Sequence, residues 1–366
     1  MSKKIRVLMI TGSWPPVRCG VGDYASKLVS YLSKKLDVHI VTSLGADHNE
    51  RVYNDIKKWN LFNWPRVRRH IIDLQPDIIH MQYPSVMYRR NLFPNLLPRL
   101  IKRKFPKIPF VLTIHEYHDA SLLGKKRIEL TLKGPDILIF TNDNDASDLE
   151  SFLKQDQNRV IPIGSNIEVA KISEDKRVSL LDSYGLRNGK YWLYIGFVDP
   201  SKGLGNLLDA IRMDQNKLPL VIATEYDETN AYHKEIRARI DKSSASVIWT
   251  NYVSSEDLSI LLGAAYAVVL PFDKPATNRR GSVIAALEHG KAIITTGDLQ
   301  NSVFSNSAKL IPDNSLESIS GAMRSLVQDP KEKRRLESAA KIMVKKYSWP
   351  EIARAHEEVY IERSRS

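Results

Sequence analysis

The sequence predicts an α/β protein made of two doubly wound domains, each a parallel sheet with helices on both faces. Short apolar runs alternate with longer segments of helical periodicity, a pattern that is typical of buried parallel strands joined by helices. The alternation stops once near the middle of the chain and then starts again. The 366 residues are also enough for two domains, because one domain usually holds about 100 to 200 residues.

The first half contains six short apolar runs, and segments with helical spacing, such as 25–32, separate several of them. Strands that are covered on both faces are expected to be short and apolar throughout. We therefore predict that residues 1–166 form the first doubly wound domain, with strands at Ile5–Ile10, Val38–Thr42, Ile78–Met81, Phe110–Ile114, Ile137–Thr141 and Val160–Ile163.

The second half repeats the pattern after a stretch with proline and glycine at 162–166 and a polar segment at 173–177. We predict a second doubly wound domain over 167–346, with helices at 204–211, 231–240 and 258–262 among those between the strands. The strand order cannot be read from the sequence. The expected strands are Trp192–Ile195, Leu218–Ala223, Val247–Trp249, Ala267–Leu270 and Ala292–Thr295.

The last segment, 347–366, is predicted to form a helix of its own. Ser348 and Glu351 have the spacing of a capping box, in which each side chain bonds to a backbone N–H of the other residue. Apolar side chains then recur along one side of 351–363, at Ile352, Ala355, Val359 and Tyr360.

The chain carries a formal net charge of +12, and much of the excess lies between residues 51 and 110. Only Asp55, Asp73 and Asp77 oppose the basic residues there. Such a surface attracts phosphates, nucleic acid or anionic lipids, or it is simply a solvated basic face. The basic residues are Arg51, Lys57, Lys58, Arg66, Arg68, Arg69, Arg89, Arg90, Arg99, Lys102, Arg103, Lys104 and Lys107.

Leucine and isoleucine alternate with basic residues over 96–104, which predicts an amphipathic helix. This helix lies either on a membrane or against its own sheet. The start of the chain lacks a signal-peptide pattern, and no apolar run approaches the roughly 20 residues of a membrane span. The single Cys19 excludes an intramolecular disulfide. We therefore expect a cytoplasmic protein.

A glycine loop follows the first predicted strand. Gly20 and Gly22 precede a predicted helix, where glycine lets the backbone approach a ligand and aim its N–H groups at an anion. A tight turn without a ligand is the alternative. A dinucleotide-binding fingerprint is disfavoured because the G-x-G-x-x-G spacing is absent.

A polar cluster follows the strand at 110–114, where ligands of open α/β sheets usually bind. His115, Glu116 and His118 are suited to proton transfer or to binding sugar hydroxyl groups. The alternatives are surface histidines without a role and a metal site that lacks a further ligand. The D-x-D sequence at 143–145 is better explained as the start of a helix rich in capping residues.

Two further loops in the second half favour an anion. Gly196 and Lys202 lie between a predicted strand and helix, where a lysine beside free N–H groups suits a diphosphate. A second loop leads into the helix at 283–289 and offers guanidinium groups and backbone N–H groups together. Its residues are Arg279, Arg280, Gly281 and Ser282.

With these four segments, the chain resembles the family 4 glycosyltransferases, which have the GT-B fold of two Rossmann-like domains facing across a cleft. The resemblance covers nearly the whole length and implies a final helix that crosses back to the first domain. It implies that Lys202 binds the diphosphate and that His115 lies beside the transferred sugar. We expect Tyr24, Glu116 and His118 to lie on the acceptor side. The remaining donor contacts are expected from Gly20, Gly22, Gly196, Asn251, Arg279, Arg280, Gly281 and Ser282.

The chain departs from the family pattern at three positions. Phe197 stands where an arginine is common, and Thr277 and Ala285 stand where many members have two glutamates eight positions apart. We expect Arg279 or Arg280 to supply diphosphate contacts instead. The catalytic residues are then His115, Lys202 and Arg280, with no metal or other cofactor.

The resemblance implies retaining transfer of a hexose from a nucleotide-diphosphate sugar to a glycan or lipid-linked acceptor. We expect this reaction to serve cell-surface polysaccharide or glycoconjugate synthesis at the inner face of the plasma membrane, where the basic first domain would bind anionic lipid. A degenerate member that only binds a sugar nucleotide or a partner is the alternative, motivated by the missing glutamates. Nucleic-acid binding rests on net charge alone and is not expected.

Overall fold

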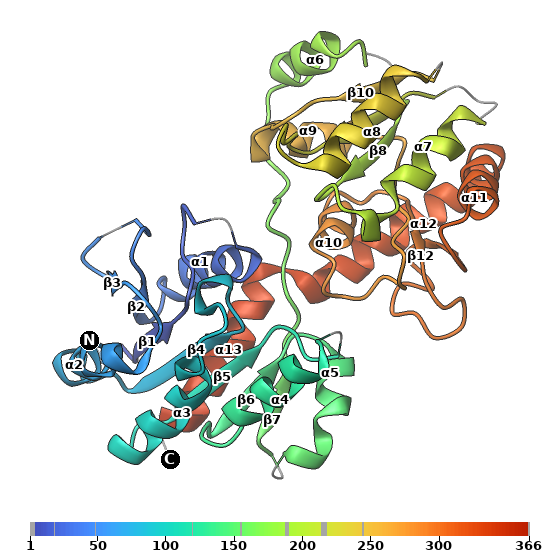
Figure 1. Ribbon diagram of the computed structural model, residues 1–366. Helices are drawn as coiled ribbons and strands as arrows, with labels where there is room; N and C mark the ends of the chain where they lie inside the picture. Colours follow the sequence, from blue (N-terminus) through green and yellow to red (C-terminus); the bar gives the residue numbers. More distant parts are fainter. Residues whose placement is uncertain are drawn as a thin grey trace. The chain divides into compact units, whose positions relative to one another are not determined.

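The computed structural model describes residues 4–17, 19–47, 49–118, 120–153, 156–186, 190–213, 218–243 and 245–364. They divide into two compact units. The first contains Met1–Gly164 and Ser348–Ser366, and the second contains Ser165–Tyr347. In Figure 1, the red C-terminal helix α13 (Trp349–Ser364) lies beside the blue-to-green strands of the first unit.

The described part of the first unit contains a seven-stranded parallel sheet of order β3-β2-β1-β4-β5-β6-β7. Its helices, besides α13, are α1 (Gly20–Leu32), α2 (Trp64–Leu74), α3 (Phe93–Lys104), α4 (Leu122–Thr131) and α5 (Asp143–Asp148), with short 3-10 turns at Leu61–Asn63, Val86–Tyr88 and Glu150–Phe152. Its strands are β1 (Arg6–Ile10), β2 (Asp37–Ser43), β3 (Val52–Ile56), β4 (Ile78–Tyr83), β5 (Phe110–Ile114), β6 (Ile137–Phe140) and β7 (Asn158–Val160).

The second unit repeats this plan with six described parallel strands in the order β10-β9-β8-β11-β12-β13. Its helices are α6 (Glu174–Ser183), α7 (Leu204–Arg212), α8 (Ala231–Asp241), α9 (Ser255–Ala264), α10 (Gly281–Glu288), α11 (Leu316–Gln328) and α12 (Pro330–Met343), with 3-10 turns at Pro200–Lys202 and Val344–Tyr347. Its strands are β8 (Trp192–Ile195), β9 (Leu220–Ala223), β10 (Val247–Trp249), β11 (Ala267–Leu270), β12 (Ile293–Thr296) and β13 (Lys309–Ile311). The predicted pair of doubly wound domains is confirmed.

The sequence-based strand assignment was wrong at three of the four sheet ends, and only the end strand β10 was predicted with its observed bounds. Strands β3 and β13 were not predicted, and β7 ends at Val160, where the predicted strand began. All three are outermost in their sheets and carry partly exposed side chains. An edge strand need not be apolar on both faces, so it lacks the continuous run that marks the buried strands.

Alternate residues along the strands of the first sheet belong to two separate hydrophobic cores, one on each face. Val7 and Met9 of β1 pack with residues of α1 and α13, whereas Leu8 and Ile10 pack with residues of α2 and α3. The side chains of a strand point alternately to opposite faces, so α1 and α13 share one face of the sheet. Contacts of α13 with α1 and β4 agree with this placement.

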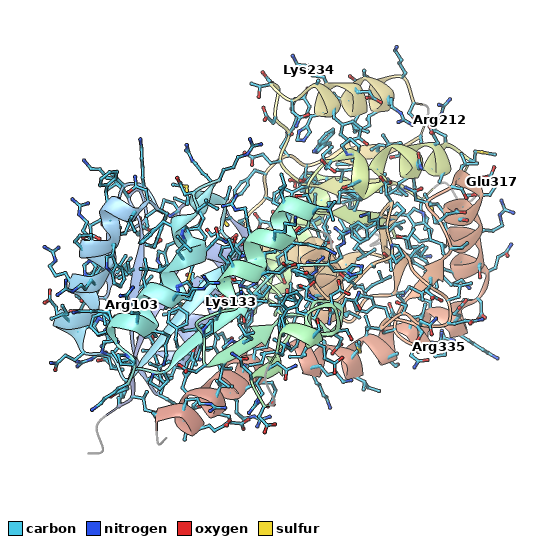
Figure 2. All side chains as sticks on the ribbon, turned by 60° about the horizontal axis from the view of Figure 1, so that its bottom comes forward. Arg103, Lys133, Arg212, Lys234, Glu317 and Arg335 are labelled. Carbon is cyan, nitrogen blue, oxygen red and sulfur yellow. The ribbon has the colours of Figure 1, made fainter. Side chains whose placement is uncertain are left out.

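Helix α3 settles one of the alternatives left open by the sequence. Its apolar side chains Leu97 and Ile101 are completely buried in the core beside α2. The basic side chains of its last turn include Arg103, which is exposed on the surface of the first unit (Figure 2). The apolar side of this helix therefore packs on its own sheet.

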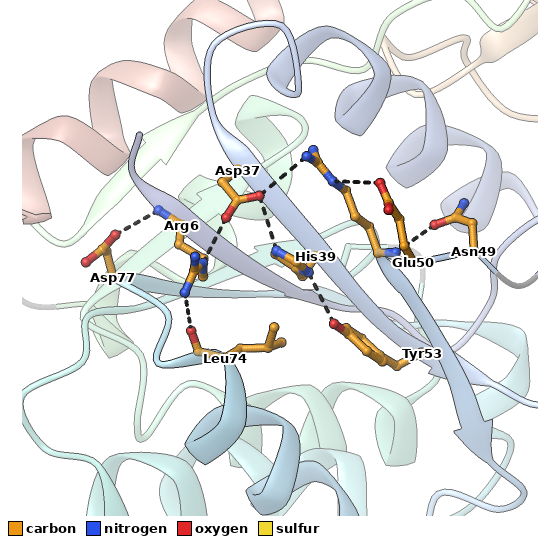
Figure 3. Close-up of polar contacts among 9 residues, drawn as sticks. Arg6, Asp37, His39, Asn49, Glu50, Tyr53, Leu74 and Asp77 are labelled. Carbon is orange, nitrogen blue, oxygen red and sulfur yellow. Dashed lines mark hydrogen bonds and ion pairs between the residues drawn. The ribbon is translucent and has the colours of Figure 1, made fainter. Parts of the chain in front are cut away.

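A polar network surrounds the starts of β1 and β2 (Figure 3). The Arg6 guanidinium donates to Asp37 and to the carbonyl oxygen of Leu74, each at 2.8 Å, and the Arg6 backbone N–H donates to Asp77. Burial raises the pKa of Asp37, but hydrogen bonds and charge from Arg6 and His39 outweigh it and lower that pKa overall. The amino-terminal edge of the sheet is thus closed by structural ion pairs, and the opposite edge carries the candidate site.

Candidate functional site

The residues singled out from the sequence gather at the carboxyl ends of strands, within each unit separately. In the first unit His115 directly follows β5, and α1 follows β1. In the second unit the loop that contains Gly196 and Lys202, called the lysine loop, follows β8. The loop that contains residues 279–282, called the arginine loop, follows β11. Open α/β sheets bind ligands at this edge, and β8 and β11 are neighbours in their sheet.

Two cations of the second unit meet at one aromatic ring. The Lys202 Nζ lies 5.6 Å from the centre of the Phe272 ring, and the Arg280 Cζ lies 4.6 Å from it. Phe272 itself is buried. Cations are attracted to the face of an aromatic ring, so Phe272 orders two basic side chains that are far apart in the sequence. We call Lys202, Phe272 and Arg280 the cation cluster.

The lysine loop is held against the end of β11 by a close backbone contact. Gly203 has a φ of +69°, and a Cβ at this position would lie 1.8 Å from the carbonyl oxygen of Pro271. The Asp273 N–H donates to the Ser201 carbonyl oxygen at 3.1 Å, and the Asp199 carboxylate accepts from the Ser201 N–H at 2.9 Å. These contacts fix the backbone on both sides of the lysine.

The charges around Lys202 favour a bound anion. Burial lowers the pKa of Lys202, and the neighbouring Arg280 lowers it further, although Asp199 and Asp273 oppose the shift. A lysine that loses part of its basicity to a second cation regains it when an anion binds beside both. The cation cluster is therefore poised to hold phosphate groups.

The start of helix α10 lies next to this cluster, since Arg280 is its N-cap residue and Gly281 its first residue. A Cβ at Gly281 would meet no atom within 4 Å, and a Cβ at Gly196 would lie 3.8 Å from the Ser282 side chain. The exposed glycine leaves the backbone accessible at a helix end that attracts negative charge.

The other predicted donor-side residues occupy less specific surroundings. Asn251 is exposed, follows β10 and has a φ of +61°. Arg279 is half-buried beside the N-cap of α10. Phe197 is 84% exposed, and Ala285 is buried within α10. The Ala285 side chain has almost no contact with solvent.

In the first unit His115 is held from two sides. Its Nε2 lies 2.8 Å from the Gln82 Oε1, and its ring meets the Tyr24 ring edge-on at 4.9 Å. The His115 backbone N–H donates to the Tyr83 carbonyl oxygen at 2.8 Å. The half-buried imidazole is thus oriented at the strand end.

The predicted glycine loop and Tyr24 have largely structural surroundings. A Cβ at Gly22 would lie 3.0 Å from the Ser13 backbone, whereas Gly20 is exposed with open space around it. Tyr24 is buried, and its hydroxyl lies 3.5 Å from the His356 Nε2. Tyr24 therefore supports the His115 ring and has no exposed hydroxyl group.

The other two polar residues after β5, Glu116 and His118, lie in different environments. Glu116 is exposed, whereas the His118 Nδ1 lies 2.9 Å from the Asp148 Oδ2. The D-x-D sequence forms the start of α5, because the Asn142 side chain accepts from the Asp145 N–H, and the helix interpretation is confirmed. Within the described ranges, no three His, Cys, Asp or Glu side chains are grouped to hold a metal.

Sequence reasoning missed two buried polar residues beside His115. Gln82 and His80 are completely buried in β4. The signal was present, because His80-Met-Gln82 interrupts the apolar run that begins at Ile78. Buried polar side chains require partners, and these residues find them in the network described further below.

The contact between α13 and the sheet makes the first unit sensitive to acid. Burial lowers the pKa of His356 to about 4, despite the hydrogen bond to the Ile352 carbonyl oxygen. Burial also lowers the pKa of His80. The unfolded chain, with a histidine pKa of about 6.5, then binds protons that the folded chain does not. Stability should be full above about pH 6.5 and should fall toward pH 4, by roughly 3 kcal/mol for His356.

Urea unfolding followed by tryptophan fluorescence at pH 7.5 and pH 5 checks this expectation. His356→Phe should weaken the pH dependence while His80 retains its share. A wild-type protein equally stable at both pH values would contradict the assignment of neutral buried histidines.

Two family models match this chain. The model described as "Glycosyltransferase Family 4" matches residues 19–169, and the model described as "Glycosyl transferases group 1" matches residues 182–343. Each match contains most strands of one unit, and together they extend over the greater part of the chain. A search of curated protein sequences finds no significant match.

Solved structures share the fold over nearly the whole length. Anabaena HepE in complex with UDP is 14% identical, with a TM-score of 0.79 and coverage of 98% of this chain and 100% of that chain. A glycosyltransferase from Rickettsia africae is 17% identical, with a TM-score of 0.78 and 98% coverage of both chains.

Sucrose-phosphate synthase from Thermosynechococcus elongatus is 19% identical, with a TM-score of 0.73 and coverage of 98% of this chain and 99% of that chain. At these identities the structures establish the GT-B fold, and the two family models establish the class of enzyme. The chain is a glycosyltransferase and belongs to glycosyltransferase family 4.

Proposed function

We propose that this enzyme transfers a hexose from a UDP-sugar to a hydroxyl group of a glycan or lipid-linked acceptor, with retention of configuration and without a metal. The observation that carries the proposal is the cation cluster, in which Lys202 and Arg280 meet on the Phe272 ring beside the start of α10. The cluster provides two positive charges and a helix amino terminus for a diphosphate.

The reaction requires charge stabilisation at the leaving group. The bond between the anomeric carbon and the diphosphate oxygen breaks, and its electron pair remains on that oxygen. A new bond forms between the acceptor hydroxyl oxygen and the anomeric carbon, and the hydroxyl proton passes to the departing diphosphate or to water. Lys202 and Arg280 stabilise the developing charge on the diphosphate, and each well-placed donor of this kind contributes about 3 kcal/mol.

The donor nucleotide is inferred from relatives of the same fold. HepE structures hold UDP, UDP with glucose, or UDP-glucose, and this supports a UDP-sugar here. His115 is assigned to the transferred sugar because the family resemblance places a histidine there and the ring is oriented at the strand end.

We place the chain in a branch that lacks the usual glutamate pair. Ala285 and Thr277 stand at the corresponding positions, and neither side chain can supply a carboxylate. Arg279 and Arg280 take over part of the donor binding in this proposal. The ribose is then held by groups other than the second glutamate.

The absence of carboxylates at these two positions also supports a second candidate. A family member without the pair could bind a sugar nucleotide and not transfer the sugar. The two candidates differ in turnover: the enzyme releases UDP from a UDP-sugar in the presence of an acceptor, whereas the binding protein is stabilised by the nucleotide without releasing UDP.

A thermal-shift screen with nucleoside diphosphates and nucleotide-sugars tests the donor assignment. We expect UDP and one UDP-sugar to raise the melting temperature, because a ligand that binds only the folded state stabilises it. UDP release over an acceptor panel then tests transfer. Equal shifts with all nucleoside diphosphates, or none with UDP, would overturn the UDP assignment.

We also propose that the first unit binds anionic membrane at the cytoplasmic face, where a lipid-linked acceptor would reside, as part of cell-surface polysaccharide or glycoconjugate synthesis. Basic residues outnumber acidic ones thirteen to three over 51–110, and exposed apolar side chains accompany them at Leu61 and Phe62. Arg103 of this set is exposed, and Lys133 adds a further exposed basic side chain to this unit (Figure 2). No helix in the described ranges is long and apolar enough to cross a bilayer.

Vesicle co-sedimentation checks this association. Binding should be stronger to anionic than to neutral vesicles and should weaken with salt, since each basic residue near the surface contributes about 1 kcal/mol. Phe62→Ser should reduce binding, whereas Ile342→Ser, at an exposed apolar position of the second unit, should not. Equal binding to both vesicle types would contradict the proposal.

A further inference from the structure

One face of the first sheet carries a buried polar chain that leads to His115. Ile78, His80 and Gln82 alternate along β4 and so share a face. Ile78 packs in the core formed with α1 and α13, which places His80 and Gln82 toward the same helices. Both polar side chains are completely buried.

Hydrogen bonds join the polar groups on this face into a chain. The Gln82 Oε1 lies 2.8 Å from the His115 Nε2, and the Gln82 Nε2 lies 3.2 Å from the His80 Nε2. The His80 Nδ1 lies 2.5 Å from the Tyr360 hydroxyl of α13. The Thr113 hydroxyl also lies 2.7 Å from the His80 Nε2.

Hydrogen-bond chemistry assigns the protons along this chain. The amide nitrogen of glutamine only donates, so the His80 Nε2 must be unprotonated and must accept. The neutral His80 ring then carries its proton on Nδ1 and donates it to the Tyr360 hydroxyl. The Gln82 carbonyl oxygen only accepts, so the His115 Nε2 carries a proton and donates it.

A purely structural core would not need these groups. Burying a polar group costs free energy that its hydrogen bonds only partly return, and apolar replacements of the same shape are often neutral or stabilising. The remaining core side chains around α13 include Val359 and Ile352, which are apolar and buried. The chain of polar groups is thus a costly feature of this core, and the group at its half-buried end is His115.

We propose that Gln82 is a positioning residue for sugar transfer, which fixes the His115 ring by accepting from its Nε2–H, with His80 and Tyr360 buried behind it. This contact fixes both the orientation of the ring and the nitrogen that carries the proton toward Gln82. The inference rests on the proposed role of His115 in transfer. It adds a residue that touches neither donor nor acceptor.

The tautomer can be measured without any substrate. Long-range ¹⁵N–¹H correlation spectra of histidine-labelled protein, with His115 signals assigned by their loss in His115→Asn, report which ring nitrogen is protonated. We expect a protonated Nε2 in the wild type. A protonated Nδ1 would mean that the Gln82 amide is reversed and would overturn the proposal without requiring any variant to fold.

Gln82→Met removes both hydrogen bonds at nearly constant volume and should allow the Nδ1–H tautomer to form. We expect kcat to fall by about 10-fold to 100-fold, as for a misplaced catalytic group, with little change in UDP affinity. Gln82→Glu keeps an acceptor oxygen toward His115 and should restore the protonated His115 Nε2 and part of kcat, although its second oxygen cannot donate to the accepting His80 Nε2. Thermal unfolding confirms that each variant is folded.

Gln157→Met is the matched control, because Gln157 is a buried glutamine of the same unit that donates to the Pro135 carbonyl oxygen at 2.8 Å. It should leave the His115 tautomer and kcat unchanged. An equal loss of kcat in both methionine variants, or a changed tautomer with unchanged kcat in Gln82→Met, would overturn the positioning role. Failure of the proposed function is distinct, because the wild type would then neither bind UDP nor turn over a UDP-sugar.

Discussion

Replacing Lys202 or Arg280 with alanine is expected to reduce sugar transfer by about 100-fold to 1,000-fold, since each removes one charged donor from the leaving diphosphate. Both side chains are half-buried over the Phe272 ring and are not among the buried core residues. The loss should appear in kcat/KM for the donor, measured as UDP release over a panel of acceptors. Unchanged thermal unfolding would show that the effect is on chemistry and donor binding.

Lys274→Ala is the appropriate control for this pair. Lys274 is an exposed lysine between β11 and α10, in the loop that also holds Arg280. Its removal changes the net charge by the same amount. We expect near-normal transfer in this variant. Similar losses in all three variants would show that general positive charge matters and not the cation cluster.

Gly203→Ala is expected to destabilise the second unit by roughly 3 kcal/mol or more and to abolish transfer, because the backbone must shift to avoid a clash. The added Cβ would lie 1.8 Å from the Pro271 carbonyl oxygen, at a φ of +69°. Such a shift also displaces the adjacent Lys202. Urea unfolding and donor kinetics on the same preparation measure both effects.

Gly185→Ala separates the cost of a positive φ from the cost of the clash with Pro271. Gly185 has nearly the same φ, +67°, but a Cβ there would meet no atom within 4 Å. It should cost only the conformational penalty of about 1 to 2 kcal/mol. Equal losses of stability in the two alanine variants would refute the role assigned to the Gly203–Pro271 contact.

The interior of both sheets was predictable from the sequence because burial on two faces leaves an unbroken apolar run. The interior strands β5, β8 and β11 have the predicted bounds, and so does β10 at one end of the second sheet. The edge strands β3 and β13 were missed for the opposite reason, since their partly exposed side chains include polar ones. Strand order was also unpredictable, because the pairing of strands depends on contacts far apart in the chain.

The candidate site was only partly predictable for the same reason. Lys202 and Arg280 each follow a strand with a local pattern that favours an anion, but their meeting on Phe272 requires β8 and β11 to be neighbours. Likewise, the bond between Gln82 and His115 requires β4 to lie beside β5. Local patterns identify candidate ligands, whereas the register of neighbouring strands decides which of them act together.

Tyr24 illustrates the limit of motif transfer. Its place in the glycine loop suggested an acceptor contact, but the structure buries it between the His115 and Trp349 rings. Only the return of α13 to the first unit creates this environment, and that contact spans more than 300 residues of sequence. A position in a motif does not reveal whether a side chain faces solvent or core.

Calorimetric titration with UDP and with uridine tests the central claim, that Lys202 and Arg280 bind the donor diphosphate, most directly. We expect the wild type to bind UDP much more tightly than uridine, and most of that difference to disappear in Lys202→Ala and Arg280→Ala but to persist in Lys274→Ala. Equal affinity of the wild type for UDP and uridine, or an unchanged difference in the two cluster variants, would contradict the account.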